Sequence, residues 1–392
     1  MNQYIITFIT AVTSIILARV LGIQERGEVA ELTLLFSWFF TIHSLMNPGT
    51  MQYNSYTLQE YLSKYLGYLK VAMVAVTASS ILLGLYLSKM YLLLFIPYFF
   101  LYYANDLFQQ ILIRFGHMKA YWLNVIVFQI STMLFISIFI LTSPRVELVL
   151  LGWICGQLVF LALNIPAINK IADSAVLKVL LECSNLRKIG FDVRQNLKNH
   201  LYHLVKGLVS SGDRLVIIFM VTTEQYAAYV VMFLFNSIIM PYCMFVQATY
   251  TQTVKDHGFS SMFDLRLAIS SLIFIVGVIV LFFMSDAIIL HIIGEKYVGN
   301  ELLAKLIIIF SFFSVLYVVM MEFSVIKFGV YFGYKTQCLY LFSFSISLML
   351  YAKMFDDFDV KAVPIIQIFV YALCVAYMLV TLKTKKILRK NG

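Results

Sequence analysis

The side chains with the clearest capacity for chemistry lie in one apolar stretch near the middle of the chain, from Asn199 to Val221. The stretch is long enough to cross a membrane. Its polar and ionisable members are His200, His203, Lys206, Ser210, Asp213 and Arg214. On a helix, at about 100° per residue, they fall within an arc of roughly 140°. Ionisable groups at membrane depth are costly and usually face a bundle interior or a watery cavity. The pattern therefore predicts one wall of a polar chamber.

An alternative interpretation needs no chamber. The opposite face of the same helix is apolar, with Leu201, Leu204, Val205, Leu208, Leu215 and Ile218. Lys206 and Asp213 would then lie near opposite membrane interfaces, where long side chains extend their charged ends into water. We favour the chamber, because one face collects all the polar side chains.

The composition indicates a membrane protein. Hydrophobic residues make up 61% of the chain and charged residues only 12%, whereas about a quarter of the residues of a soluble protein are charged. The five cysteines are scattered and form no C-x-x-C, so neither a metal site nor a disulfide framework is indicated. The first apolar run, from Tyr4 to Leu21, lacks the basic region and cleavage site of a signal peptide, and we expect it to be retained.

Segments of about 20 mostly apolar residues predict the transmembrane helices. They are 3–21, 28–46, 66–87, 92–113, 120–142, 147–169, 200–221, 226–249, 266–285, 302–323, 336–353 and 361–382. We therefore expect an all-α integral membrane protein with about twelve transmembrane helices. Six helices on each side of a long connection is the arrangement of two-lobed transporters, which predicts two pseudo-symmetric six-helix lobes around a central polar cavity.

The longest connection sets the predicted domains. These are an N-terminal six-helix lobe over 1–170, a basic amphipathic cytoplasmic linker over 171–199, and a C-terminal six-helix lobe with a basic tail over 200–392. The linker suits a helix that lies on an anionic inner leaflet. A solvated linker is the alternative.

The distribution of Lys and Arg predicts the orientation. With the N-terminus inside, 19 of these residues lie on the cytoplasmic side and 8 on the opposite side, as the positive-inside rule requires. Both termini are then cytoplasmic. Because this placement accounts for the net charge of +9, we expect no nucleic-acid partner.

Five short motifs in both halves of the chain resemble those of one transporter family. They are Ala18-Arg19-Val20-Leu21-Gly22 followed by Glu25 to Ala30 (family A-R-x-L-G…G-x-[YV]-A), Gly212 to Ile217 (family D-R-L-x-I), Glu224 to Ala228 (family G-x-Y-[SA]-x-A), Phe115 to Tyr121 (family G-x-x-[RK]-x-Y) and Gly294 to Tyr297 (family F-G-E-x-[YF]). The family is the Wzx-type polysaccharide flippases, in the superfamily that also contains the MATE exporters and the lipid II flippases. The chain departs from the family in lacking the glycine of the third motif, the phenylalanine of the last, and any sign of spans 13 and 14.

The resemblance implies a multi-pass protein of the bacterial cytoplasmic (inner) membrane. Its function would be to move an isoprenoid-diphosphate-linked oligosaccharide from the inner to the outer leaflet, for O-antigen or capsule assembly. The implied mechanism is alternating access, with no covalent chemistry, no catalytic residue and no cofactor. The implied partners are the lipid-linked oligosaccharide, membrane lipids, and the polysaccharide polymerase and assembly proteins.

That substrate requires a cationic path for its diphosphate. Lys206 and Arg214 are the candidates, since arginine binds such oxygens bidentately and lysine acts as a point charge. Arg19 ends the equivalent helix of the other lobe and either faces them or lies at the outer interface. His203 shares the polar face of the central helix. His43 either lines the cavity or hydrogen-bonds to another helix.

Two carboxyl groups could couple transport to an ion gradient. Asp213 and Asp106 lie within predicted spans, and a carboxyl group buried there can exchange a proton or bind Na⁺. Asn105, Gln109 and Gln110 are expected to extend the polar surroundings of Asp106. A structural ion pair, with Lys206 or another cation, is the alternative role for Asp213.

Two other functions remain open. A cation-coupled multidrug exporter of the same superfamily would need an acidic cavity, against which Lys206 and Arg214 argue. A membrane polysaccharide polymerase or acyltransferase is the alternative from another class, and a polymerase of this kind should carry a large basic outward loop, which the sequence lacks. Most tyrosines are expected in the interfacial belts.

Overall fold

The computed structural model describes residues 2–43, 58–86, 88–114, 116–169, 205, 207–209, 211–257, 265–355 and 358–390. All regular elements within these ranges are helices, and none is a strand. Seven of the described helices are long and apolar enough to cross a membrane, and two shorter apolar helices cover Tyr4–Val20 and Ala72–Tyr86. The prediction of an all-helical, multi-pass membrane protein is therefore confirmed. The full set of twelve spans and the two-lobe arrangement stay predictions.

The chain divides into two compact units. One comprises Met1–Glu25 and Leu32–Leu204, and the other comprises Arg26–Glu31 and Val205–Gly392. The short segment Arg26–Glu31 thus belongs to the second unit, although it lies far from the rest of that unit in the sequence. The predicted linker, 171–199, lies outside the described residues.

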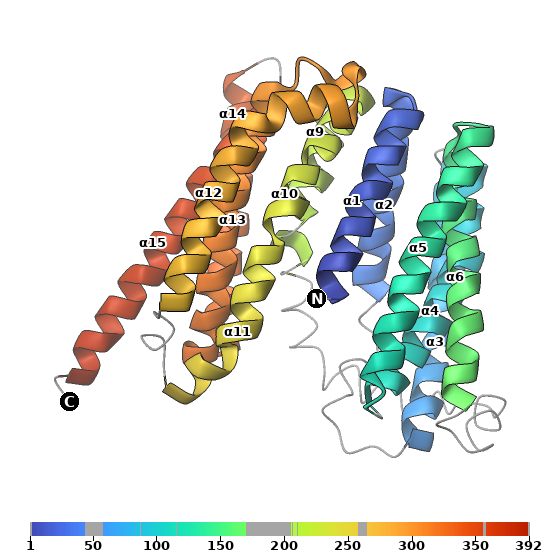
Figure 1. Cartoon of the computed structure of the whole chain (residues 1–392), viewed down its shortest axis with the longest axis horizontal. Coiled ribbons are helices and arrows are strands. Elements are labelled where there is room, and N and C mark those ends of the chain that lie inside the picture. The colour runs from blue at the N-terminus through green and yellow to red at the C-terminus, as the bar shows by residue number, and fades with distance from the viewer. Residues whose placement is uncertain are drawn as a thin grey trace. The chain divides into compact units, whose positions relative to one another are not determined.

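The first unit contains most of the first six helices. They are α1 Asn2–Val20, α2 Ile23–His43, α3 Leu58–Tyr86, the 3₁₀ helix η3 Met90–Leu94, α4 Phe95–Arg114, α5 Met118–Thr142 and α6 Val146–Asn169. Figure 1 shows α4, α5 and α6 side by side, and α6 packs against both of the others. α1 packs against α5, and α3 against α4.

Two glycines one helical turn apart bring α6 close to α5. A Cβ atom on Gly152 would lie 2.9 Å from the backbone nitrogen of Ile136, and one on Gly156 would lie 3.1 Å from the Cα of Thr132. Small residues four apart allow helix backbones to approach this closely in membranes. The sequence Gly152-x-x-x-Gly156 therefore determines how α5 and α6 pack.

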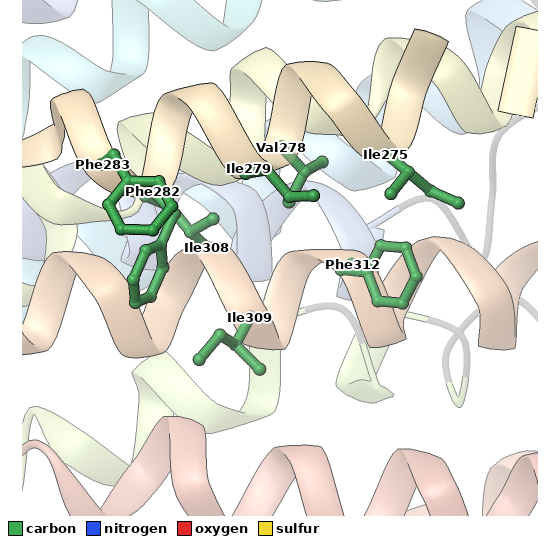
Figure 2. A pocket seen from close by; sticks show the side chains of 8 residues that line it. All are labelled: Ile275, Val278, Ile279, Phe282, Phe283, Ile308, Ile309 and Phe312. Carbon is green, nitrogen blue, oxygen red and sulfur yellow. The ribbon is translucent and has the colours of Figure 1, made fainter. Parts of the chain in front are cut away.

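The second unit is built around α13. Its helices are α9 Thr223–Met232, α10 Leu234–Ile239, α11 Pro241–His257, α12 Leu265–Ile288, the π-helix η6 Ile289–Ile293, the 3₁₀ helix η7 Glu295–Tyr297, α13 Glu301–Phe328, α14 Val330–Met354 and α15 Ala362–Lys390. α13 packs against α9, α10, α11, α12, α14 and α15. Figure 1 shows α12 and α13 side by side, and side chains of these two helices line an apolar groove, drawn in Figure 2.

The central polar stretch is helical in its described part, residues 205, 207–209 and 211–217. The helix ends at Ile217 rather than at Val221, because the amides of Met220 and Val221 both bond the carbonyl of Ile217 in a turn. Thr222 then caps α9. Its Oγ1 accepts a bond of 3.3 Å from the Gln225 amide, while the Gln225 side chain accepts one of 3.2 Å from the Thr222 amide. This reciprocal cap fixes the start of α9.

Candidate functional site

Asp213 lies on the buried face of the 205–217 helix. Val209, Asp213 and Ile217 are four residues apart, so they share a face, and all three are buried. At Asp213, the polar face of this helix therefore points toward the interior of the second unit.

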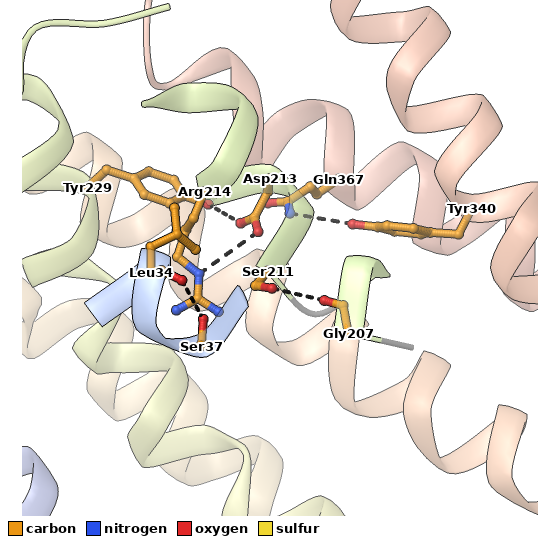
Figure 3. A network of polar contacts seen from close by, with 9 residues as sticks. All are labelled: Leu34, Ser37, Gly207, Ser211, Asp213, Arg214, Tyr229, Tyr340 and Gln367. Carbon is orange, nitrogen blue, oxygen red and sulfur yellow. Dashed lines mark hydrogen bonds and ion pairs between the residues drawn. The ribbon is translucent and has the colours of Figure 1, made fainter. Parts of the chain in front are cut away.

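The Asp213 carboxylate has one short hydrogen bond. Its Oδ2 accepts a bond of 2.8 Å from the hydroxyl of Tyr229 on α9, as Figure 3 shows. Its Oδ1 is also buried and has no hydrogen-bond donor among the described residues. The guanidinium of Arg214 approaches this oxygen, with its Nε 4.0 Å from Oδ1. A buried carboxylate normally recruits several donors, so this arrangement leaves capacity for a proton or a cation.

Arg214 is the more accessible member of the pair. Its side chain is 30% exposed, against 3% for the side chain of Asp213. The guanidinium carbon lies 5.0 Å from the ring centroid of Phe233, a distance at which a cation–π interaction is favourable. Phe233 thus positions a guanidinium that keeps part of its donor surface accessible.

Aromatic rings and an amide surround this pair on the interior side. The ring of Tyr371 lies 4.8 Å from that of Tyr340, between centroids. Tyr340 Oη accepts a bond of 3.4 Å from the amide of Gln367. Both tyrosines are close enough to Asp213 to interact with its charge. We call Asp213, Arg214, Tyr229, Tyr340, Gln367 and Tyr371 the Asp213 cluster.

The second acidic candidate, Asp106, lies on α4 in the first unit. It is half-buried and accepts a bond of 3.4 Å from the side chain of Gln110. Its charge acts on three tyrosines, Tyr102, Tyr103 and Tyr121. Asp106 and Asp213 are therefore both carboxylates beside phenolic hydroxyls, each within its own unit.

Asn105 does not belong to the surroundings of Asp106 as predicted. It points into a buried chain of neutral amides, because neighbouring residues on a helix differ in direction by about 100°. Its amide donates to the side-chain oxygen of Gln157 at 2.8 Å and accepts from Asn164 at 3.1 Å, and Asn164 accepts from Asn124 at 2.9 Å. These bonds join α4, α5 and α6, so the amides hold helices together.

Of the other predicted site residues, Arg19 is the one whose side chain is among the described residues. Arg19 lies in the last turn of α1, in the first unit, and is exposed. His203 and Lys206 lie outside the described residues, and so does the side chain of His43, the last residue of α2. Within its described part, the chain contains no group of three or more His, Cys, Asp or Glu side chains that could hold a metal ion.

Sequence reasoning missed the tyrosines. Tyr226, Tyr229, Tyr297, Tyr317 and Tyr340 are among the largest fully buried side chains of the described residues. Apolar patterning carried no signal for them, because a tyrosine ring suits an interior and an interface equally well. The four-residue spacing of Gln367 and Tyr371 on α15 is the one pattern that could have indicated a shared polar face.

Three of the motif segments meet in the second unit around Arg26. This residue is 5% exposed and lies close enough to Tyr226 and Tyr297 for their charges to interact. Burial lowers the pKa of the Arg26 guanidinium, and it raises the pKa of Tyr297 to about 12, against the opposing effect of Arg26. A Cβ atom on the adjacent Gly27 would lie 2.5 Å from the carbonyl oxygen of Thr223.

Gly294, the glycine of the last motif, is favoured at its position by the backbone conformation. Its φ of 132° and ψ of 150° follow the π-helix η6, in a region that only glycine adopts readily. This turn directs Tyr297 toward Arg26. The motifs around Arg26, Gly27 and Gly294 therefore have a role in packing.

The helices and the Asp213 cluster define a multi-pass α-helical membrane protein with a charged pair inside one helical unit. Comparison with protein-family models, with curated proteins and with solved structures found no match.

Proposed function

We propose that this protein is a flippase that moves an isoprenoid-diphosphate-linked oligosaccharide from the inner to the outer leaflet. The observation that carries the proposal is the pair on the 205–217 helix: a partly exposed guanidinium, Arg214, beside the buried carboxylate of Asp213. An arginine held within a membrane-spanning unit is costly and marks a substrate or ion path. Its planar fork matches the oxygens of a diphosphate.

The task itself explains why such a path would be built. The charged diphosphate and the sugars need polar partners while they cross, whereas the isoprenoid tail stays in the hydrocarbon. Arg214, with Lys206, His203, His43 and Arg19 as further candidates, would supply the cationic partners. Alternating access would present these residues to each leaflet in turn, with no bond made or broken and therefore no catalytic residue.

The same proposal places the protein in the bacterial cytoplasmic membrane. The product of flipping, a lipid-linked repeat unit in the outer leaflet, is the substrate that a polysaccharide polymerase would consume. A polymerase and its assembly proteins are therefore the partners that the proposal implies.

An ion gradient would drive the cycle through Asp213. The buried Oδ1 of this carboxylate accepts no hydrogen bond from the described residues. A proton or Na⁺ that binds there would replace the 4.0 Å contact between Oδ1 and Arg214. Asp106, among its three tyrosines, is the corresponding candidate in the first unit.

The second candidate function is a cation-coupled multidrug exporter. The observation that favours it is the aromatic environment of Asp213, with the rings of Tyr340 and Tyr371 close by, since aromatic faces and a carboxylate together suit an organic cation. Arg214 argues against it, because its own positive charge lies 4.0 Å from that carboxylate.

The test uses a strain that lacks the gene and is complemented with single variants. Arg19, Lys206, Asp213 and Arg214 are each replaced by alanine, Arg214 also by lysine, and the exposed Arg145, outside the cluster, serves as the matched control for Arg214. Surface polysaccharide, the inward-facing pool of lipid-linked precursor and protein amount are measured on the same membranes. We expect Arg214→Ala to lose surface glycan while precursor accumulates inside, Arg214→Lys to retain part of it, and Arg145→Ala to match the wild type.

Three outcomes would redirect the proposal. Normal translocation with arrested chain lengthening in the deletion strain would establish the polymerase. Unchanged glycan with raised sensitivity to cationic drugs would establish the exporter. Wild-type behaviour of Arg214→Ala at normal protein amount would exclude this arginine as part of the substrate path.

A further inference from the structure

The outer faces of α12 and α13 form a groove of about 260 Å³ that is lined only by hydrocarbon side chains, shown in Figure 2. Ile275, Ile279 and Phe282 contribute from α12, and Ile309 and Phe312 from α13. Both helices are among those long and apolar enough to cross a membrane. The groove therefore lies at the depth of the lipid hydrocarbon.

One end of this groove carries an ion pair. Lys305 Nζ lies 2.8 Å from Asp286 Oδ2, and both side chains are partly exposed. Lys305 precedes Ile309 by one helical turn on α13, and Asp286 follows Phe282 by one turn on α12, so the pair continues the two walls of the groove. Lys305 Nζ also lies 6.0 Å from the ring centroid of Phe282. The groove and the ion pair are thus parts of one surface.

The length of this surface matches one leaflet. From residue 275 to residue 286, α12 rises about 16 Å at 1.5 Å per residue, and half of a bilayer's hydrocarbon core is about 15 Å. A lipid whose headgroup contacts Lys305 and Asp286 would therefore reach the far end of the groove with one acyl chain.

The charges select the headgroup. Lys305 and Asp286 together carry no net charge, so a diphosphate or an anionic phospholipid would gain from the lysine but be repelled by the carboxylate. A zwitterion satisfies both, with its phosphate on Lys305 and its ammonium on Asp286. A primary ammonium has N–H groups to donate to the carboxylate, whereas a quaternary choline has none.

We propose that this surface is a binding site for phosphatidylethanolamine, with the headgroup on the Lys305–Asp286 pair and one acyl chain in the groove. The proposal is independent of the flippase, because it involves neither Arg214 nor the Asp213 cluster. A phospholipid bound at a fixed site would stabilise α12, whose outer face is otherwise exposed along its length: Ile279 is 50% and Phe283 75% exposed.

The experiment measures lipid retention by the purified full-length chain with native mass spectrometry. Phosphatidylethanolamine, phosphatidylglycerol and phosphatidylcholine of the same acyl composition are added at equal concentration. The variants are Asp286→Asn, which is nearly isosteric, and Ile279→Trp, which fills the groove. Ile273→Trp is the matched control, since Ile273 is an exposed isoleucine of α12 that does not line the groove.

We expect the wild type to retain phosphatidylethanolamine about tenfold over the other two lipids, the preference that one charge-assisted hydrogen bond supplies. Asp286→Asn should abolish the preference, Ile279→Trp should lower retention of the lipid, and Ile273→Trp should change neither. Equal retention of all three lipids by the wild type would overturn the proposal. So would a preference for phosphatidylglycerol, or an equal loss in Ile279→Trp and Ile273→Trp. Thermal unfolding of each variant in lipid-free detergent identifies any loss that comes from misfolding.

Discussion

At the scale of single residues, the buried carboxylate of Asp213 carries a desolvation cost in the second unit. Removing a carboxylate from water is expensive unless donors replace the lost solvent. Among the described residues, Tyr229 provides the one hydrogen bond to it, at 2.8 Å, and Arg214 approaches only to 4.0 Å. Tyr229 therefore orients the carboxylate and carries much of its stabilisation.

Replacing Tyr229 by phenylalanine should lower the free energy of unfolding by about 1–3 kcal/mol, because the buried carboxylate loses its donor. The matched control is Tyr297→Phe. Tyr297 is equally buried, but its hydroxyl has no hydrogen-bond partner among the described residues, so its removal should change stability by less than about 0.5 kcal/mol. Chemical unfolding in detergent measures both. Equal losses in the two variants would show that the Tyr229–Asp213 bond contributes nothing specific.

Tyr297 also predicts a dependence on pH. Its pKa is about 12 in the folded protein and near 10 in an unfolded chain. The folded state therefore favours the neutral phenol, so the contribution of this group to stability is complete below about pH 10 and is lost as the pH rises toward 12. Between pH 9 and pH 11 the wild type should lose more in melting temperature than Tyr297→Phe. A difference between the two proteins that stays constant over this range would contradict the burial of the phenol.

At the scale of elements, the glycines of α6 are decisive for the first unit. A Cβ atom on Gly152 would come within 2.7–2.9 Å of side-chain and backbone atoms of Ile136, so α5 and α6 could not keep their present separation. The hydrogen bond from the Asn124 amide to the Asn164 side-chain oxygen, at 2.9 Å, crosses the same interface. Close backbone approach and neutral hydrogen bonds thus act together there, as is usual for helices in membranes.

Gly152→Ala should therefore destabilise the protein by about 1–3 kcal/mol through overpacking. The same substitution at Gly277, in the middle of α12, meets nothing within 4 Å and should stabilise by up to about 1 kcal/mol through helix propensity. Thermal unfolding of the two variants under identical conditions compares them directly. A stabilised Gly152→Ala protein would show that α5 and α6 are not held as closely as the structure has them.

At the scale of the whole molecule, the sequence predicts an orientation that single-cysteine labelling can test. In a chain whose own cysteines are replaced, cysteine is placed at Arg145 or Val298, on the predicted outer side, and at Lys119 or Lys335, on the predicted cytoplasmic side. All four side chains are exposed. A membrane-impermeant maleimide should label the first two in intact cells, and the last two only after permeabilisation. The reverse pattern would invert the topology, and a mixed pattern would change the number of spans.

Hydropathy was sufficient to predict the class of protein and most helices. A helix that crosses hydrocarbon must satisfy its own backbone hydrogen bonds and be apolar over about 20 residues. The hydropathy pattern of each helix is therefore local and can be read from the sequence. It also identified Asp213 and Arg214, because charges in an apolar run have few explanations. It placed the end of their helix four residues too late, since the Thr222 cap and the turn after Ile217 do not interrupt the apolar pattern.

The partners of those charges were decided only by the tertiary structure. Tyr229, Tyr340 and Gln367 come from three helices separated by many residues along the chain, and nothing local distinguishes a tyrosine bonded to a carboxylate from one at an interface. The same holds for Arg26, which the sequence placed in a connecting turn and the fold buries against Tyr226 and Tyr297. Whether a residue is helical depends mainly on its neighbours in the sequence. The environment of a polar side chain depends instead on which helix faces pack together, and this is known only when all the packed helices are in place.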